Sequence, residues 1–143
     1  FASWIQLQVR KLKKIQQKRM SGIRITVNYH FDMSEAQLQA ECFMWTWNTY
    51  PHLRRLFFHP HNEGRKTVKK AVMDRSGGVV PGIPDFVFLS PPMGIEFKIP
   101  GEKQNEDQKK VEEVWVKAGI PYHVVMSVEQ YIDIIEGVYG KKG

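Results

Sequence analysis

Three charged side chains lie inside two short apolar stretches of the sequence, where a charge without a partner is costly. Asp85 interrupts the apolar run 83–89. Glu96 and Lys98 interrupt a second run, 95–99. Burying such a group unpaired costs roughly several kcal/mol. We therefore expect these groups either to pair with one another or to hold a cation.

The two runs are rich in β-branched and aromatic residues, are bounded by Gly and Pro, and are joined by a turn-rich segment, which is typical of a β-hairpin. Side chains alternate across a strand, so Glu96 and Lys98 share one face. Asp85 lies on the same face if the residue numbers of each cross-strand pair in the hairpin add up to 183. Residues 90–93 then form the loop. This face is the candidate site. The alternative is an exposed ion pair on an edge strand, worth ~0–1 kcal/mol.

Further short motifs follow in a fixed order along the chain. Residues 82–85 are Gly-Ile-Pro-Asp, residues 96–98 are Glu-Phe-Lys, and residues 105–108 are Asn-Glu-Asp-Gln before an amphipathic helix. This ordered set resembles the PD-(D/E)xK nuclease superfamily and, within it, the VRR-NUC group of small phage and bacterial nucleases. The resemblance runs from about residue 33 to residue 135.

The resemblance implies a nuclease that depends on a divalent metal ion. Phosphodiester cleavage needs an ion that neutralises developing charge and supplies hydroxide near neutral pH, and Mg²⁺ or Mn²⁺ prefers oxygen ligands. The carboxylates of Asp85 and Glu96 are the expected ligands, with the backbone carbonyl of Phe97 as a third by resemblance. Lys98 would position the attacking water or stabilise charge in the transition state.

Two more residues match positions that face the site in this superfamily. Glu35 resembles the acid of its first helix, which helps to hold the metal, although the helix dipole also favours an acid in a first turn. Gln108 resembles a glutamine that faces the site, although it also fits a capping box with Asn105. The sequence leaves both alternatives open for each residue.

The segment 59–70 supplies candidates for contact with DNA. His59 and His61 suggest zinc, but a structural zinc site needs four ligands, and no cysteine or further clustered histidine is near them in the sequence. We favour a loop that contacts DNA, followed by a basic helix over 65–74 that binds phosphates or forms an ordinary solvated face. The candidates are His61, Asn62, Arg65, Lys66, Lys69 and Lys70.

Hydrophobic periodicity and capping residues predict the order α-β-α-β-β-α-β-α from residue 34 onward. This order indicates an α/β fold with a mixed central β-sheet flanked by helices, which resembles the restriction-endonuclease-like core of the superfamily. The expected elements outside the hairpin are a helix over 34–50, a strand over 53–59, a helix over 65–74 with Val68, Ala71 and Val72 inward, a helix from 105 to 118, a strand over 122–126, and a helix from 127.

Residues 1–32 are expected to form a basic arm before a nuclease domain over 33–143. Residues 1–31 hold seven of the 21 Lys and Arg residues and none of the 15 acids, so the net charge of +6 originates there. A helix over 1–20 would hold a nucleic-acid backbone or pack on a partner or on the domain. A strand over 23–29 would pair at a sheet edge or across a homodimer. Whether the arm is native, processed or an upstream read-through stays open.

Composition narrows the class of protein. With 143 residues, 42% of them hydrophobic, the chain can bury one core. No apolar run reaches membrane-spanning length, and no signal-peptide core appears. The single cysteine, Cys42, excludes an internal disulfide and suits a reducing cytoplasm. The resemblance implies that this is the cytoplasm of a bacterium or of a phage-infected cell.

We therefore expect a metal-dependent endonuclease acting on DNA, since the VRR-NUC group includes structure-specific nucleases and its standalone members resemble dimeric junction resolvases. The resemblance implies that branched, flap or Holliday-junction-like DNA is the substrate. One alternative is a catalytically silent DNA-binding module with the nuclease fold, against which Asp85, Glu96 and Lys98 argue. Another is a phage assembly factor whose arm binds protein.

Overall fold

The computed structural model describes residues 33–60 and 67–142, and within them four strands form a mixed sheet in the order β1-β2-β3-β4. Strands β1 and β2 pair antiparallel, β2 and β3 pair antiparallel, and β3 and β4 pair parallel. The predicted α/β class and the predicted order of elements are confirmed. The strands are β1 (Phe57–Phe58), β2 (Phe86–Leu89), β3 (Pro92–Phe97) and β4 (Tyr122–Val125).

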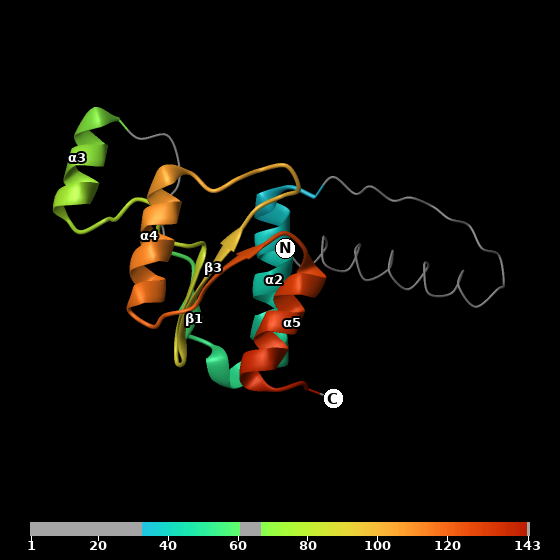
Figure 1. Cartoon of the computed structure of the whole chain (residues 1–143). Helices are drawn as coiled ribbons and strands as arrows, with labels where there is room; N and C mark the ends of the chain where they lie inside the picture. Colours follow the sequence, from blue (N-terminus) through green and yellow to red (C-terminus); the bar gives the residue numbers. More distant parts are fainter. Residues whose placement is uncertain (1–32, 61–66, 143) are drawn as a thin grey trace. The chain divides into compact units, whose positions relative to one another are not determined.

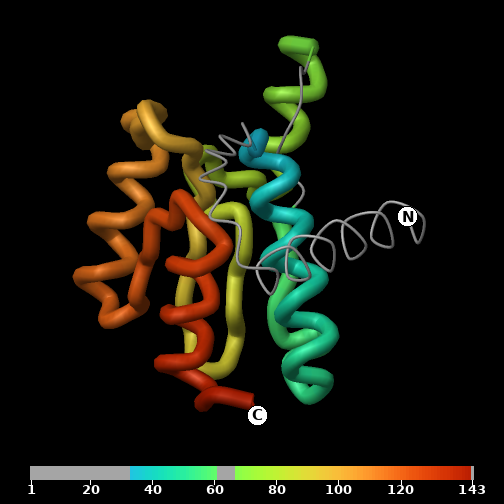
Figure 2. The backbone as a smooth tube through the Cα atoms, turned by 90° about the vertical axis from the view of Figure 1, so that its right-hand side faces the viewer, coloured from blue at the N-terminus to red at the C-terminus, as the bar shows by residue number. Residues whose placement is uncertain are grey.

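Helices cover both faces of the sheet (Figure 1). Helices α2 and α5 lie side by side on one face and α4 lies on the other, as the view turned by 90° also shows (Figure 2). Among the described residues, no helix combines the length and the apolar character needed to cross a membrane. The helices are α2 (Glu35–Thr49), α3 (Val68–Ser76), α4 (Glu106–Lys117) and α5 (Val128–Tyr139), with a 3-10 turn η1 (Pro51–Leu53) after α2.

Side-chain caps fix where the long helices begin. The Ser34 hydroxyl accepts from the Gln37 N–H, and the Gln37 side chain accepts from the Ser34 N–H, so the predicted capping box opens α2. A second box, between Asn105 and Gln108, opens α4. Each box satisfies backbone N–H groups that have no partner inside the helix, which sets the start of both helices that border the site.

The core lies between the sheet and helices α2 and α5. Phe86 and Phe88 of β2, Ile95 and Phe97 of β3 and Tyr131 of α5 are each at most 1% exposed. The Tyr131 ring contacts the rings of Phe86 and Phe97. Because each such side chain contributes about 1.5–3 kcal/mol when buried, this face of the hairpin holds the fold together.

Two predicted elements differ from the structure. The strand expected over 53–59 is reduced to Phe57–Phe58, because the chain first forms η1 and then turns at Arg55, whose φ is 69°. Helix α3 begins at Val68, with Thr67 as its cap. Val68 and Val72, expected inward, are 83% and 59% exposed, since α3 buries none of its residues.

The predicted hairpin register is wrong by two residues. Phe88 pairs with Met93 and Leu89 with Pro92, so paired numbers sum to 181 and the loop is only Ser90-Pro91. The shorter loop lets pairing extend through Met93, which is 1% exposed. A shift by two keeps every side chain on its predicted face, so the shared face expected for the charged groups is retained.

Candidate active site

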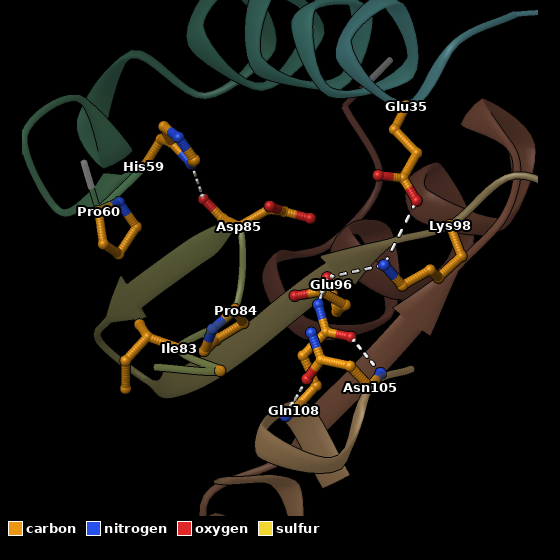
Figure 3. A pocket seen from close by; sticks show the side chains of 11 residues that line it. Glu35, His59, Pro60, Ile83, Pro84, Asp85, Glu96, Lys98, Asn105 and Gln108 are labelled. Atoms are coloured by element: carbon orange, nitrogen blue, oxygen red, sulfur yellow. Dashed lines mark hydrogen bonds and ion pairs between the residues drawn. The ribbon is translucent and has the colours of Figure 1, made fainter. Parts of the chain in front are cut away.

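The five residues expected to do chemistry come together in one hollow (Figure 3). The hollow lies where the segment before β2, the end of β3, and the first turns of α2 and α4 meet. Its volume of about 220 Å³ has room for an ion with several water molecules of ~30 Å³ each. The lining residues are Glu35, His59, Pro60, Gly82, Ile83, Pro84, Asp85, Glu96, Lys98, Asn105 and Gln108.

Asp85 is held through both its side chain and its backbone. Its Oδ2 accepts a hydrogen bond of 2.8 Å from the backbone N–H of Phe97, and its carbonyl oxygen lies 2.6 Å from Nδ1 of His59. Continuing the β2–β3 register by one step beyond Phe86 and Ile95 sets Asp85 opposite Glu96. The two carboxylates therefore share the face that opens into the hollow.

Glu96 is the most buried charged group of the site, with 3% of its surface exposed. Its Oε1 accepts from Nε2 of Gln108 and lies 3.5 Å from Nζ of Lys98. Its Oε2 is buried and has no hydrogen-bond partner among the described residues. Burial and the charge of Asp85 raise the pKa of Glu96 to about 8, against the opposing effect of Lys98. The carboxyl therefore takes up a proton near neutral pH unless a cation offsets these effects.

Lys98 contacts acidic side chains from two elements, Glu35 of α2 and Glu96 of β3. Its Nζ lies 3.3 Å from Oε1 of Glu35, in addition to its contact with Glu96. Burial lowers the pKa of Lys98, but the carboxylates of Glu96 and Glu35 outweigh it, so the net pKa is raised and the ammonium is retained. Burial and the neighbouring Glu102 carboxyl raise the pKa of Glu35, while Lys98 lowers it.

Gln108 fills both of the roles that the sequence left open. Its Oε1 accepts from the N–H of Asn105 at 2.9 Å, which completes the capping box. Its Nε2 donates to Oε1 of Glu96. The cap therefore fixes which end of the amide faces the carboxylate, since only the NH₂ group can donate.

Gly82, the first residue of the Gly-Ile-Pro-Asp motif, and Gly94 of β3 let α4 approach the segment before β2 and β3 itself. A Cβ atom on Gly82, whose φ is +85°, would clash with the backbone of Asp107. A Cβ atom on Gly94 would lie 2.7 Å from the Trp115 ring. The available sequence signal is the glycine two residues before Pro84, which marks a close approach of backbone as well as a turn.

The donor set fits a hard cation that also takes backbone or water ligands. Asp85 and Glu96 supply two carboxylates, and the unpartnered Oε2 of Glu96 is the buried polar atom that an ion would satisfy. In the ranges 33–60 and 67–142, no three His, Cys, Asp or Glu side chains gather closely enough to bind a metal alone. A third ligand would therefore have to be a carbonyl, such as that of Phe97, or water.

Most of the DNA-contact candidates lie outside the described residues. These are His61, Asn62, Arg65 and Lys66, together with the whole arm over residues 1–32. Lys69 and Lys70 are exposed on α3. The zinc alternative at His59 and His61 includes a residue outside the described ranges, while His59 itself lines the hollow.

Comparison with protein-family models and with curated proteins found no match. A solved structure described as a VRR_NUC domain protein matches with a TM-score of 0.61 over 73% of this chain and 87% of that chain, at 20% sequence identity. At this identity the likeness shows a shared fold. The predicted resemblance to VRR-NUC proteins is therefore confirmed at the level of the fold.

Proposed function

We propose that this chain is a divalent-metal-dependent endonuclease that hydrolyses phosphodiester bonds in DNA. One observation carries the proposal: two carboxylates, Asp85 and Glu96, face one open hollow beside the Lys98 ammonium, and Oε2 of Glu96 is buried without a hydrogen-bond partner among the described residues. Leaving a carboxylate oxygen in this state costs free energy that a bound cation would offset. The fold shared with a VRR_NUC domain protein favours nuclease chemistry over other uses of such a site.

The ligands of Mg²⁺ or Mn²⁺ would be the carboxylates of Asp85 and Glu96 and the carbonyl of Phe97. The bound ion would neutralise charge on the phosphate and lower the pKa of a water molecule. Gln108 holds Oε1 of Glu96, which leaves Oε2 for the ion. The Phe97 N–H holds Oδ2 of Asp85, so both carboxylates are oriented before a ligand arrives.

Lys98 is the group that would act on the phosphate and the attacking water. Its ammonium lies in the hollow between Glu35 and Glu96, with 12% of its side chain exposed. A charged donor in such a partly buried position can orient a water molecule or stabilise the negative charge of the transition state. Glu35 keeps Lys98 in place and is the positioning partner in this scheme.

Branched DNA is the substrate geometry to test first, since flap and four-way junctions are what the family resemblance implies. The same resemblance implies a homodimer, which sedimentation of the full chain would measure. DNA contacts are assigned to Lys69 and Lys70 on the exposed face of α3 and to the residues outside the described ranges.

The test is cleavage of linear, flap and four-way DNA in Mg²⁺ and Mn²⁺, with DNA binding measured in Ca²⁺. Lys98→Ala should reduce cleavage by about 10²–10³-fold, the usual cost of losing one preorganised donor, and leave binding intact. Lys109→Ala is the matched control, because this lysine forms an exposed ion pair with Glu106 and does not line the hollow. Binding without any cleavage by the wild type would instead support the catalytically silent module.

A further inference from the structure

The pairing of β1 with β2 ends at an unusual point, directly beside Asp85. The N–H of Leu89 donates to the carbonyl of Leu56 at 2.9 Å, and these residues lie opposite each other in the register that pairs Phe57 with Phe88. In an antiparallel ladder, hydrogen-bonded pairs alternate with pairs that are not bonded. The pair Phe58 and Val87 is therefore of the bonded kind, and so is the position two residues further along.

That next position would place residue 60 opposite Asp85. In a bonded pair, the N–H of residue 60 would donate to the carbonyl of Asp85. Residue 60 is Pro60, which has no N–H, so this bond to the Asp85 carbonyl cannot form. Strand β1 accordingly ends at Phe58, and β2 begins at Phe86, directly after Asp85. Without another donor, the Asp85 carbonyl would lose its partner at the edge of the site.

The His59 imidazole takes the place of the missing backbone donor. Its Nδ1 lies 2.6 Å from the carbonyl oxygen of Asp85. A carbonyl oxygen can only accept, so Nδ1 carries the proton and the hydrogen bond sets the protonation of that nitrogen. His59 and Pro60 both line the hollow (Figure 3). The side chain of one residue thus supplies the bond that its proline neighbour cannot.

We propose that His59 is a positioning residue for the metal site: its Nδ1–H group replaces the ladder bond lost at Pro60 and so fixes the backbone from which the Asp85 carboxylate projects. The inference rests on the proposed function for its metal-binding part. Asp85 is then held from two strands, by His59 of the β1 end at its carbonyl and by Phe97 of β3 at its Oδ2. Loosening the first of these contacts should loosen the second.

Substitutions at position 59 separate this role from direct contact with substrate. In His59→Asn the amide NH₂ occupies nearly the place of Nδ1 and keeps the donor. In His59→Gln the NH₂ moves to the place of Nε2, and in His59→Ala no donor remains. His52→Ala is the matched control, since it removes an exposed imidazole that does not line the hollow.

The first measurement is Mn²⁺ affinity of the full chain by titration calorimetry, with cleavage of DNA measured in parallel. Loss of a partner that holds a metal ligand typically weakens metal binding 10–100-fold. His59→Ala and His59→Gln should therefore bind Mn²⁺ about tenfold more weakly. His59→Asn and His52→Ala should stay within about twofold of the wild type.

The second measurement needs no metal. The amide resonance of Phe97 and its hydrogen-exchange protection report the bond to Oδ2 of Asp85 in chelator. Protection should fall in His59→Ala and His59→Gln and persist in His59→Asn. If His59→Ala does not fold, the contrast between the Asn and Gln variants decides.

The outcomes separate the two proposals. If the wild type neither binds Mn²⁺ nor cleaves DNA, the proposed function is wrong, while the Phe97 amide still tests the positioning role. If His59→Asn loses Mn²⁺ affinity and Phe97 protection as severely as His59→Ala, the Nδ1–H group is not what matters and the positioning role is overturned. Unchanged affinity and protection in His59→Ala would overturn it too.

Discussion

The two faces of the β2–β3 hairpin differ in polarity and in their effect on stability, although their residues alternate along the same strands. The face toward α2 and α5 is built from aromatic and aliphatic side chains that are almost fully buried, such as Phe86 and Phe97. The opposite face opens into the hollow and holds Asp85 and Glu96 at close range. The first face stabilises the fold and the second costs stability, so one hairpin both carries the core and presents the site.

Removing a buried side chain from the apolar face should change the unfolding free energy most. Phe97→Ala removes a fully buried ring that contacts Phe86 and Tyr131. The expected loss is about 3–5 kcal/mol of unfolding free energy. Denaturant unfolding in chelator measures it. If Phe97→Ala unfolds at the wild-type denaturant concentration, the contrast between the two faces is wrong.

Removing a charge from the face that opens into the hollow should raise the unfolding free energy instead of lowering it. The folded-state pKa of Glu96 is raised from 4.5 to about 8, so the folded protein binds the proton more tightly than the unfolded chain does. The resulting stability is complete below about pH 4.5 and is lost as the pH rises toward 8, at about 1.4 kcal/mol per pH unit. Glu96→Gln should abolish this loss in chelator and melt above the wild type at pH 9.

The control for that experiment is Glu106→Gln, which changes an exposed carboxylate in the first turn of α4. It should follow the wild-type pH profile. Parallel profiles for wild type and Glu96→Gln between pH 5 and pH 9 would show that burial does not strain this carboxyl.

The close approach of α4 to the charged face can be tested by a smaller change, the addition of one methyl group at Gly82. A Cβ atom there meets the backbone of Asp107, and the φ of +85° is unfavourable for alanine. Gly82→Ala should cost about 1–3 kcal/mol and shift the start of α4, moving Gln108 away from Glu96. Gly101→Ala has a similar φ of +93° and open space around it, so it isolates the backbone strain. Equal unfolding free energies for both variants would rule out the close approach at Gly82.

The sequence predicted the parts of this arrangement that depend on local chemistry. The capping boxes at Ser34 and Asn105 and the order of elements follow from neighbouring residues, and the shared face of the charged groups follows from the two-residue period of a strand. The register was wrong because it depends on the burial of Met93, which only the packed core determines.

Other features depend on contacts between distant segments and leave little local signal. The exposure of Val68 and Val72 reflects that α3 packs on no face of the sheet, whereas their spacing alone suggested an inward stripe. The bond between His59 and Asp85 needs the β1–β2 register to be known before the missing donor of Pro60 can be noticed.

The central claim is that the charged face is strained because it is built to hold a cation, and divalent-metal binding by Asp85→Asn tests it most directly. Asparagine keeps an oxygen that can accept from the Phe97 N–H but removes one of the two charges. The measurement is thermal melting of wild type and Asp85→Asn in chelator and across Mg²⁺ and Mn²⁺ titrations at fixed ionic strength. We predict that the variant melts higher than the wild type in chelator and gains much less from metal, since binding to the folded state alone raises the melting temperature. A variant that melts lower in chelator and responds to metal as the wild type does would show that Asp85 is a structural hydrogen-bond acceptor and not a metal ligand.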